Sequence, residues 1–319
     1  MRQVLIAILA FFFLTCNIHQ RNNINPFQKI ENYNGNVNLS IEKKLLNTPS
    51  KIIDFLNDLD NIDFYSSYEL DNSEKQLFIS YFEFLPNKFK KIIEAKVIGI
   101  YFINNFKGGG MTESVFDNNG NMYMVLFFNP EILKQNITQW IYFRDISAFN
   151  FYDRGLAIEI NINENYYGLI HTLFHEASHI YDFYNYVTPY TEPFLQNEKT
   201  KFPTEFVKNI WKNYNEPIEK YNFINREKIY SYDLGERIDG NFAIGIYESL
   251  KNTPFTSIYG SKTWAEDFAE SFTWYYLKKF YGIKYITTLL DNEEPLLTYD
   301  PNENELVKAR YKILEEIIE

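Results

Sequence analysis

The segment LIHTLFHEASHIYDF, residues 169–183, contains three of the four histidines in a chain of 319 residues. These three, His171, His175 and His179, recur at every fourth position, so a helix would place them on the same side. Large apolar residues fill most of the other positions of the segment. The pattern predicts a helix that passes through the core of a domain rather than along its surface.

The pentapeptide HEASH within this segment predicts a metal site. His175 and His179 would lie one helical turn apart, so both imidazole rings can bind the same Zn²⁺. Glu176 would reach a water on that ion as a general base without being a ligand. His171 lies further round the helix, and we expect it to be packed or hydrogen-bonded rather than a ligand. The alternative, a chance HExxH pattern on a surface helix, is disfavoured because histidine is rare in this chain and the helix is apolar.

A catalytic zinc takes three protein ligands and keeps one open position. No histidine follows the pentapeptide, so we expect the third ligand to be a carboxylate. The segment WAEDFAESF, residues 264–272, places Glu266 and Glu270 one turn apart on an apolar helix. Buried carboxylates are costly unless they are paired or bound to a metal. We therefore expect Glu266 to be the ligand and Glu270 to accept the second ring N–H of His175 or His179.

Other candidates for the third ligand are weaker. Some zinc sites use a histidine six residues after the second histidine of HExxH, but that position holds Asn185 here. Asp267 is a competing carboxylate, and we expect it to face solvent. An alternative interpretation of the helix that carries Glu266 and Glu270 is a surface element whose carboxylates form salt bridges.

Two segments together resemble a known family of zinc proteases. They are HEASHIYD at 175–182 and FTSIYGSKTWAEDFAESF at 255–272. The zinc-protease domain of anthrax lethal factor and related gluzincins, which include the Pro-Pro endopeptidases, shows HExxHxxD, a TSYG-like turn and ExxxE on a helix. In that family the tyrosine of the turn lies seven residues before the glutamate ligand, as Tyr259 does before Glu266 here. The resemblance covers residues 165–280 with gaps.

This resemblance implies a zinc-dependent endopeptidase with a zincin-like fold and one Zn²⁺ per chain. The implied zinc ligands are His175, His179 and Glu266. Glu176 would be the general base, Tyr259 would stabilise the oxyanion, and Asp182 would support the ligands from behind. The interval between the two segments is longer than in the lethal-factor domain, which implies an insertion around residues 186–240. The cleft walls, and with them the substrate, are therefore expected to differ.

Apolar periodicity along the chain predicts an α+β fold with a small mixed sheet, the HExxH helix and a helical C-terminal subdomain. We expect one peptidase domain over residues 41–319, with an N-terminal subdomain to about residue 185 and the helical subdomain at about 186–319. The strand expected at 121–128 is either an edge strand that pairs with an extended substrate or an ordinary core strand. Two helices are expected in the first part of the chain, at 41–59 with an interruption at Pro49 and at 73–95 with an interruption at Pro86. Three more are expected later: one that starts near Asn163, one that ends at Gly282 and one that closes the chain. The expected strands are 96–104, a hairpin over 111–129 that turns at 118–121, and 156–162.

The N-terminal residues 1–16 are typical of a signal peptide. Arg2 precedes an apolar run from Val4 to Leu14, which is too short to cross a bilayer but suits the core of such a signal. Cys16 follows, either as the lipid-accepting residue of a membrane-anchored lipoprotein or as a residue discarded by ordinary cleavage. Residues 17–40 are rich in asparagine and predict a tether. We therefore expect an exported protein at the cell surface, or secreted.

Composition limits the classes of function. The chain has 31 basic and 42 acidic residues, a net charge of −11, which argues against a nucleic-acid partner. Its 45% of apolar residues excludes a disordered protein. We expect a protein or peptide as the substrate. The main alternative is a non-catalytic, zinc-containing surface lipoprotein that binds a partner, and a zinc hydrolase acting on another kind of bond is a second. Glu176 disfavours the first, because a structural zinc site has no use for a base.

Overall fold

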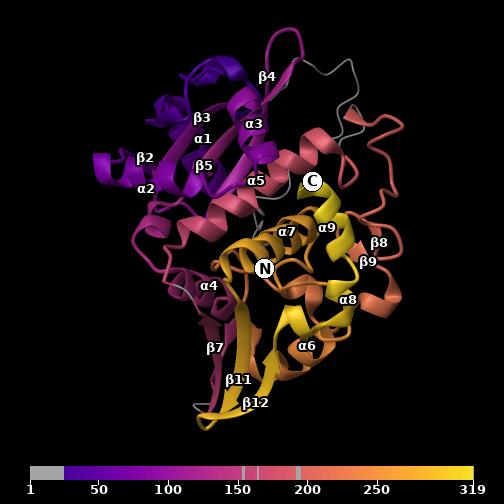
Figure 1. The fold of residues 1–319 in the computed structure, drawn as a ribbon. Coiled ribbons are helices and arrows are strands. Elements are labelled where there is room, and N and C mark those ends of the chain that lie inside the picture. Colours follow the sequence, from indigo (N-terminus) through magenta and orange to yellow (C-terminus); the bar gives the residue numbers. More distant parts are fainter. Residues whose placement is uncertain (1–24, 153–154, 164, 192–194, 319) are drawn as a thin grey trace, which may run out of the picture. The chain divides into compact units, whose positions relative to one another are not determined.

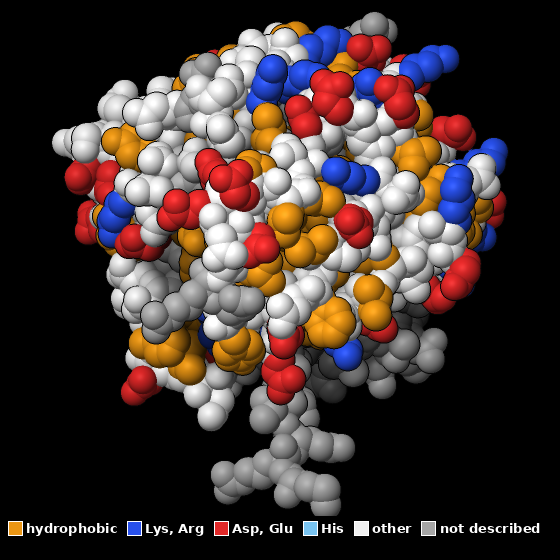
Figure 2. All heavy atoms as spheres, turned by 90° about the horizontal axis from the view of Figure 1, so that it is seen from below, with side chains coloured by type: hydrophobic (Ala, Val, Ile, Leu, Met, Phe, Trp, Pro, Cys, Tyr) orange, Lys and Arg blue, Asp and Glu red, His pale blue; other side chains and the backbone are white. Residues whose placement is uncertain are grey.

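The computed structural model describes residues 25–152, 155–163, 165–191 and 195–318. The expected signal peptide, Cys16 and the first part of the expected tether lie outside these residues. The described chain combines helices with small sheets of mixed direction, as the predicted α+β class requires. None of the helices in it is long and apolar enough to cross a membrane. Figure 2 shows one face of the molecule, on which acidic side chains are scattered among apolar and uncharged ones.

The chain divides into two compact units. The first contains the described residues up to Glu131, together with Thr191 and residues 195–196. The second contains the rest, including both helices that carry the expected metal ligands. This division lies earlier in the chain than the subdomain boundary expected near residue 185.

A five-stranded mixed sheet forms the centre of the first unit (Figure 1). Strand β3 pairs in parallel with β1 and β5 and antiparallel with β2, while β4 pairs antiparallel with β5. The strands are β1 (Leu45–Leu46), β2 (Ser66–Tyr68), β3 (Val97–Asn104), β4 (Gly110–Phe116) and β5 (Met122–Phe128). The hairpin predicted at 111–129 is therefore present as β4 and β5. However, β5 is paired on both sides, so the edge-strand interpretation of residues 121–128 is wrong and the core-strand alternative holds.

The helices of the first unit are α1 (Ser50–Asp60), α2 (Asn72–Phe82) and α3 (Asn87–Lys96). Pro49 and Pro86 stand just before α1 and α3, where a proline stabilises a helix start instead of interrupting it. All three helices bury aromatic or aliphatic side chains, as the helical spacing predicts.

The described part of the expected tether is packed against the first unit. Phe27 and Tyr33 belong to its hydrophobic core, with 4% and 8% of their surfaces exposed. The Phe27 ring stacks on Phe127 of β5 at 5.1 Å, and the Tyr33 hydroxyl donates to the Phe27 carbonyl at 2.6 Å. The tether prediction is thus wrong for residues 25–40. Two aromatic anchors outweigh the polar composition around them.

A three-stranded antiparallel sheet in the second unit was not predicted in full. It consists of β7 (Leu156–Ile162), β11 (Tyr285–Asp291) and β12 (Glu294–Tyr299), with β11 in the middle. Asn292 and Glu293 connect β11 to β12 with φ values of 49° and 69°, the left-handed conformation of a tight hairpin turn. The C-terminal part of the chain is therefore not purely helical, which corrects that expectation.

The main helices of the second unit are α4 (Ile137–Ile146), α5 (Leu169–Asn185), α6 (Ala243–Leu250) and α7 (Trp264–Tyr281), and α5 and α7 pack against each other (Figure 1). Helix α5 begins at Leu169 rather than near Asn163. The Asn163 side chain instead binds the Gly282 carbonyl at 3.0 Å and the Lys284 amide at 2.7 Å. Helix α7 ends as predicted at Gly282, which has φ 71°.

The expected closing helix is divided into α8 (Glu305–Lys308) and α9 (Tyr311–Ile318). Arg310 lies in the break and extends a buried side chain to Asp267 of α7. Shorter strands are β6 (Phe149–Asn150), which pairs with β10 (Ile238–Asp239), and β8 (Trp211–Asn213), which pairs with β9 (Glu216–Pro217). Single 3-10 turns occur at 26–28, 30–32, 42–44, 130–133, 219–221, 226–228, 240–242 and 301–303.

Candidate metal centre

Helix α5 belongs to the second unit and is largely buried. Thirteen of its seventeen residues are buried, among them His175 and Glu176 with 5% and 4% exposure. Gly168 allows its start to approach α4 closely, since a Cβ there would lie 2.8 Å from the Trp140 side chain. His179 is the more exposed of the two expected histidine ligands, which leaves one side of the pair open.

Helix α7 presents its two glutamates toward α5. Thr263 caps the helix and accepts the Glu266 amide on its side-chain oxygen at 3.2 Å, so Glu266 stands in the first turn. The Glu266 side chain is 20% exposed, whereas that of Glu270 is fully buried. The two carboxylates thus occupy a partly open and a closed position one turn apart.

Three ligand atoms converge between these helices. His175 Nε2 lies 3.0 Å from Glu266 Oε2 and 3.2 Å from His179 Nε2, and His179 Nε2 lies 3.7 Å from Glu266 Oε2. Ligand atoms at ordinary Zn–N and Zn–O bond lengths in a tetrahedral site are about 3.3 Å apart. The observed spacings scatter around that value, so the three side chains fit one small ion. The structure therefore brings together the residues that the sequence pattern assigned to one site.

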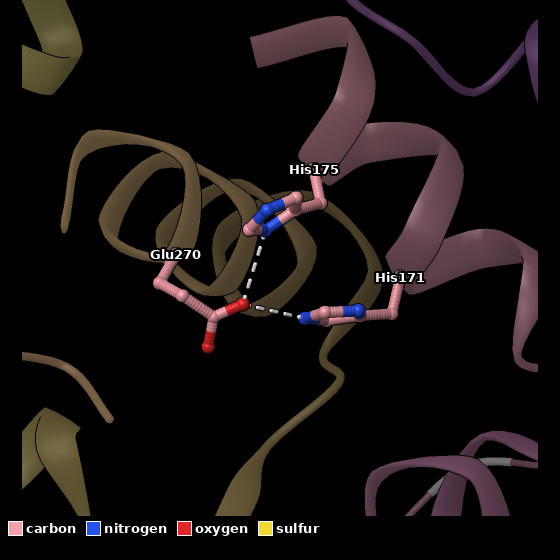
Figure 3. Close-up of side chains that lie close together, drawn as sticks. All are labelled: His171, His175 and Glu270. Carbon is pink, nitrogen blue, oxygen red and sulfur yellow. Dashed lines mark hydrogen bonds and ion pairs between the residues drawn. The ribbon is translucent and has the colours of Figure 1, made fainter. Parts of the chain in front are cut away.

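Glu270 points one carboxylate oxygen toward both His175 and His171, as Figure 3 shows. Its Oε1 atom lies 3.2 Å from His175 Nδ1 and 3.0 Å from His171 Nε2. An N–H bond from Nδ1 to a carboxylate leaves the Nε2 lone pair of His175 available to a metal. Glu270 thus lies where it can accept the second ring N–H of His175, and it also contacts His171, which is packed and hydrogen-bonded.

His171, His175 and Glu270 form a second group whose ligand atoms are close enough to hold an ion. All three are buried, and the guanidinium of Arg144 lies 2.9 Å from Glu270 Oε2 and 3.4 Å from His171 Nε2. A fixed cation at this distance repels a divalent ion. Within the described parts of the chain, no arginine or lysine makes such a contact with His175, His179 or Glu266, and this group is partly open, so it is the better candidate for a metal site.

The two groups also differ in their electrostatics, and this difference again favours a cation at His175, His179 and Glu266. Burial lowers the pKa of His171 to about 4, so this ring is neutral. Burial also opposes the charge on His175, but the hydrogen bonds to Glu266 and Glu270 outweigh it and raise the pKa of His175 to about 10. In the ion-free protein these carboxylates therefore draw a proton onto His175. A bound metal ion would supply the same positive charge.

The carboxylates themselves stay ionised. Burial alone would raise the pKa of Glu266, but its contacts with His175 and His179 hold that pKa far below the ordinary value. Burial acts in the same direction on Glu270, and the charge of Arg144 holds its pKa well below the ordinary value. Two ionised carboxylates thus flank His175 and favour a cation there.

Tyr259 lies beside His175, in a turn that is hydrogen-bonded to α7. Its ring centre is 5.7 Å from that of His175. Ser257, two residues earlier, donates its hydroxyl to Glu270 Oε2 at 2.7 Å and accepts the Gly260 amide at 3.0 Å. Burial raises the pKa of Tyr259 well above 10, so the phenol keeps its proton and can act as a hydrogen-bond donor.

Glu176 is buried on α5, directly next to His175 in sequence. Its negative charge contributes to the raised pKa values of His175 and Tyr259, which places it in the same electrostatic environment. Asp182, which is expected to support the ligands, accepts the amide and the hydroxyl of Thr188 on its two oxygens at 2.6 and 2.7 Å. It thereby holds the segment that follows α5, and its charge also interacts with His179.

Asp267 does not face solvent, which corrects that expectation. It is fully buried and accepts bonds from Trp211 at 2.9 Å and from Arg310 at 2.7 and 2.9 Å. Because α7 is covered on several sides, Asp267 is buried even though it follows Glu266 directly in the chain. Its charge is balanced by Arg310. It serves the packing of the C-terminal segment and not the metal site.

Two residues beside the site were missed by sequence reasoning. Arg144 of α4 is buried between Asp145 and Glu270, and a charged Arg–Asp pair inside the apolar helix ITQWIYFRDI was the signal for it. Tyr232 belongs to the segment expected as an insertion, has φ 59°, and places its ring centre 6.0 Å from that of Tyr259. Nothing in the local sequence distinguished Tyr232 from the many other tyrosines.

Comparisons of the chain with models of protein families, with curated proteins and with solved structures find no match. The resemblance to lethal-factor-like proteases therefore depends on the two quoted segments, 175–182 and 255–272. The geometry of the site is independent of that resemblance.

Proposed function

We propose that this protein is a zinc-dependent endopeptidase. The observation that carries the proposal is the convergence of His175 Nε2, His179 Nε2 and Glu266 Oε2 within 3.7 Å of one another. Two imidazoles and one carboxylate form a donor set that suits zinc better than magnesium or calcium, which prefer oxygen ligands only. The adjacent Glu176 and Tyr259 supply the two further groups that peptide hydrolysis requires.

Each residue of the proposed active site would have a separate role in peptide hydrolysis. A zinc ion bound by the three ligands would lower the pKa of a bound water to about 7 and polarise the scissile carbonyl. Glu176 removes a proton from the attacking water and transfers it to the leaving amine. Tyr259 donates its O–H to the oxygen on which negative charge develops. Glu270 keeps the His175 ring oriented throughout.

The non-catalytic alternative, a zinc-containing binding protein, fits the site less well. Structural zinc sites are closed by four protein ligands. Among the described residues, the group around Glu266 contains three, and the side chains of His179 and Glu266 are 17% and 20% exposed. A partly open position is what a substrate carbonyl would need.

The decisive experiment combines metal analysis with a cleavage assay. We expect the purified protein to contain about one zinc ion per chain and to cleave members of a mixed peptide library. A chelator should abolish cleavage, and added Zn²⁺ should restore it. Zinc without cleavage of any peptide would favour the binding protein, or a hydrolase for another kind of bond. Absence of bound zinc would exclude the endopeptidase, the zinc-containing binding protein and the other zinc hydrolase.

Export is a separate proposal that rests on the N-terminal sequence. Mass spectrometry of the mature N-terminus distinguishes its two forms. A chain that starts at an acylated Cys16 would be a membrane-anchored lipoprotein, whereas an unmodified chain that starts later would be secreted. A mature chain that retains Met1 and residues 2–16 would contradict export.

A further inference from the structure

Arg144 is a fully buried cation beside the candidate metal centre. It lies on α4, and neither its side chain nor those of its two carboxylate partners has any exposed surface. Its NH1 group donates to Glu270 Oε2 at 2.9 Å, and its Nε donates to Asp145 Oδ1 at 2.8 Å. A buried ion pair of this kind is costly to form, and loss of one partner would leave an uncompensated charge in the interior.

Asp145, the other partner of Arg144, is connected to Glu270 by a further series of contacts. Asp145 accepts the Tyr285 hydroxyl at 2.6 Å on its other oxygen. The Tyr285 ring stacks on Trp274 with 4.7 Å between ring centres, and Trp274 Nε1 donates to Glu270 Oε2 at 3.1 Å. Elements α4, α7 and β11 thus all contribute to the position of one carboxylate.

Arg144 also contacts the phenol that the proposed mechanism uses. Its guanidinium carbon lies 5.4 Å from the centre of the Tyr259 ring, within the range of a cation–π contact. The same cation therefore touches Glu270, which orients the ligand His175, and Tyr259, which would stabilise the transition state.

We propose that Arg144 is a positioning residue of the metal centre, which fixes Glu270 and Tyr259 relative to each other. The inference rests on the proposed function. Arginine suits this position because its branched head binds two carboxylates while its central carbon lies over the Tyr259 ring. A lysine at this position would carry the charge but could not make these contacts together.

The direction of the effect on metal affinity separates positioning from simple charge. Arg144 is positive, so its removal by itself would strengthen the binding of a cation nearby. Loss of the orientation of Glu270, and through it of His175, would weaken binding instead. Mutations of residues that orient metal ligands typically weaken metal affinity or activity by about 10–100-fold.

The test compares Arg144→Met and Arg144→Lys with a matched control, Arg310→Met. Arg310 is also a buried arginine that pairs with an acid of α7, but its guanidinium binds Asp267 and the Pro254 carbonyl rather than residues of the candidate metal centre. Zn²⁺ affinity is measured by competition with a chromophoric chelator, and the geometry of the site by the visible spectrum of bound Co²⁺. Thermal unfolding checks the fold of each variant.

We expect Arg144→Met to bind Zn²⁺ about 10–100-fold more weakly and to change the Co²⁺ spectrum. Arg144→Lys should change the spectrum too, with a smaller loss of affinity. Arg310→Met should lower stability but keep wild-type affinity and spectrum. On a peptide that the wild type cleaves, Arg144→Met should lower kcat more than it changes KM, because Tyr259 acts in the transition state.

Several outcomes would overturn the inference. They are unchanged or tighter Zn²⁺ binding in folded Arg144→Met, or Arg144 variants that behave as Arg310→Met does. Failure of both Arg144 variants to fold, with Arg310→Met folded, would assign Arg144 to stability alone. A wild type that binds zinc and cleaves peptides while these results hold would leave the proposed function intact. A wild type that binds no zinc would refute both.

Discussion

The Nε2 atom of His175 lies 3.0 Å from Oε2 of Glu266, although 91 positions separate the two residues in the chain. His175 belongs to α5 and Glu266 to the first turn of α7, and the two helices pack against each other. The candidate metal centre is therefore a product of helix packing within the second unit.

Replacement of the expected carboxylate ligand should remove the metal. Glu266→Ala leaves two protein ligands, so we expect zinc content to fall from about one per chain to a small fraction. Glu248→Ala, which removes an exposed glutamate of α6, is the matched control and should keep its zinc. Full metal occupancy in Glu266→Ala, measured by elemental analysis, would show that Glu266 is not a ligand.

Replacement of the expected base should separate binding from catalysis. Glu176→Gln keeps nearly the same shape but cannot take a proton from water. We expect unchanged zinc content and thermal stability, with turnover reduced by about 10²–10⁴-fold or more. The measurement is kcat on a peptide that the wild type cleaves. If the variant retained wild-type turnover, Glu176 would not be the base.

The phenol of Tyr259 should matter for turnover and not for metal binding. Tyr259→Phe removes one donor to the developing oxyanion, and loss of such a donor typically lowers kcat by about 10²–10³-fold. Tyr311→Phe, which removes a hydroxyl that bonds Asn302 of the C-terminal segment, is the control and should keep wild-type kcat. An undiminished kcat in Tyr259→Phe would make Tyr259 a packing residue.

Zinc binding should release a proton. The pKa of His175 in the ion-free protein is raised to about 10, so this ring is protonated at pH 7, whereas a metal needs its neutral form. We expect release of about one proton per ion at pH 7 and an affinity that rises about tenfold per pH unit toward pH 10. Calorimetry in buffers of different ionisation enthalpy measures the released proton, and a value near zero would contradict the raised pKa.

The same shift predicts a pH dependence of stability for the ion-free protein. The folded pKa of His175, about 10, exceeds the ordinary value of 6.5. Its contribution to stability is therefore complete below about pH 6.5 and is lost as the pH rises through about 10. Urea unfolding of the chelator-treated protein should show lower stability at pH 10 than at pH 6.5. His175→Gln should reduce this difference, and an unchanged difference would assign it to other groups.

The buried pair of Asp267 and Arg310 should be important for stability alone. Asp267→Asn leaves the Arg310 charge buried without its ion pair, a change that typically costs about 3–5 kcal/mol. We expect a matching decrease in the free energy of unfolding by urea, with zinc content retained at low denaturant. A loss of zinc in the folded variant would instead indicate that Asp267 contributes to the metal centre.

The local features of the site follow from the amino-acid sequence alone. The spacing of His175 and His179 places both rings on one side of a helix wherever that helix packs, because helical geometry is local. The ExxxE spacing of Glu266 and Glu270 acts in the same way on α7. The end of α7 at Gly282 likewise depends only on a residue that adopts a left-handed conformation without strain.

The contacts between these elements, in contrast, arise from the packing of the folded chain. Helix α7 is buried on several sides, so polarity could not show that Glu266 approaches His175 while Asp267 turns to Arg310. Strand β7 pairs with β11, and Arg144 binds Glu270. Both contacts join residues that are more than a hundred positions apart in the chain. Such contacts depend on the distances and angles between packed elements, and periodicity within one segment carries no information about them.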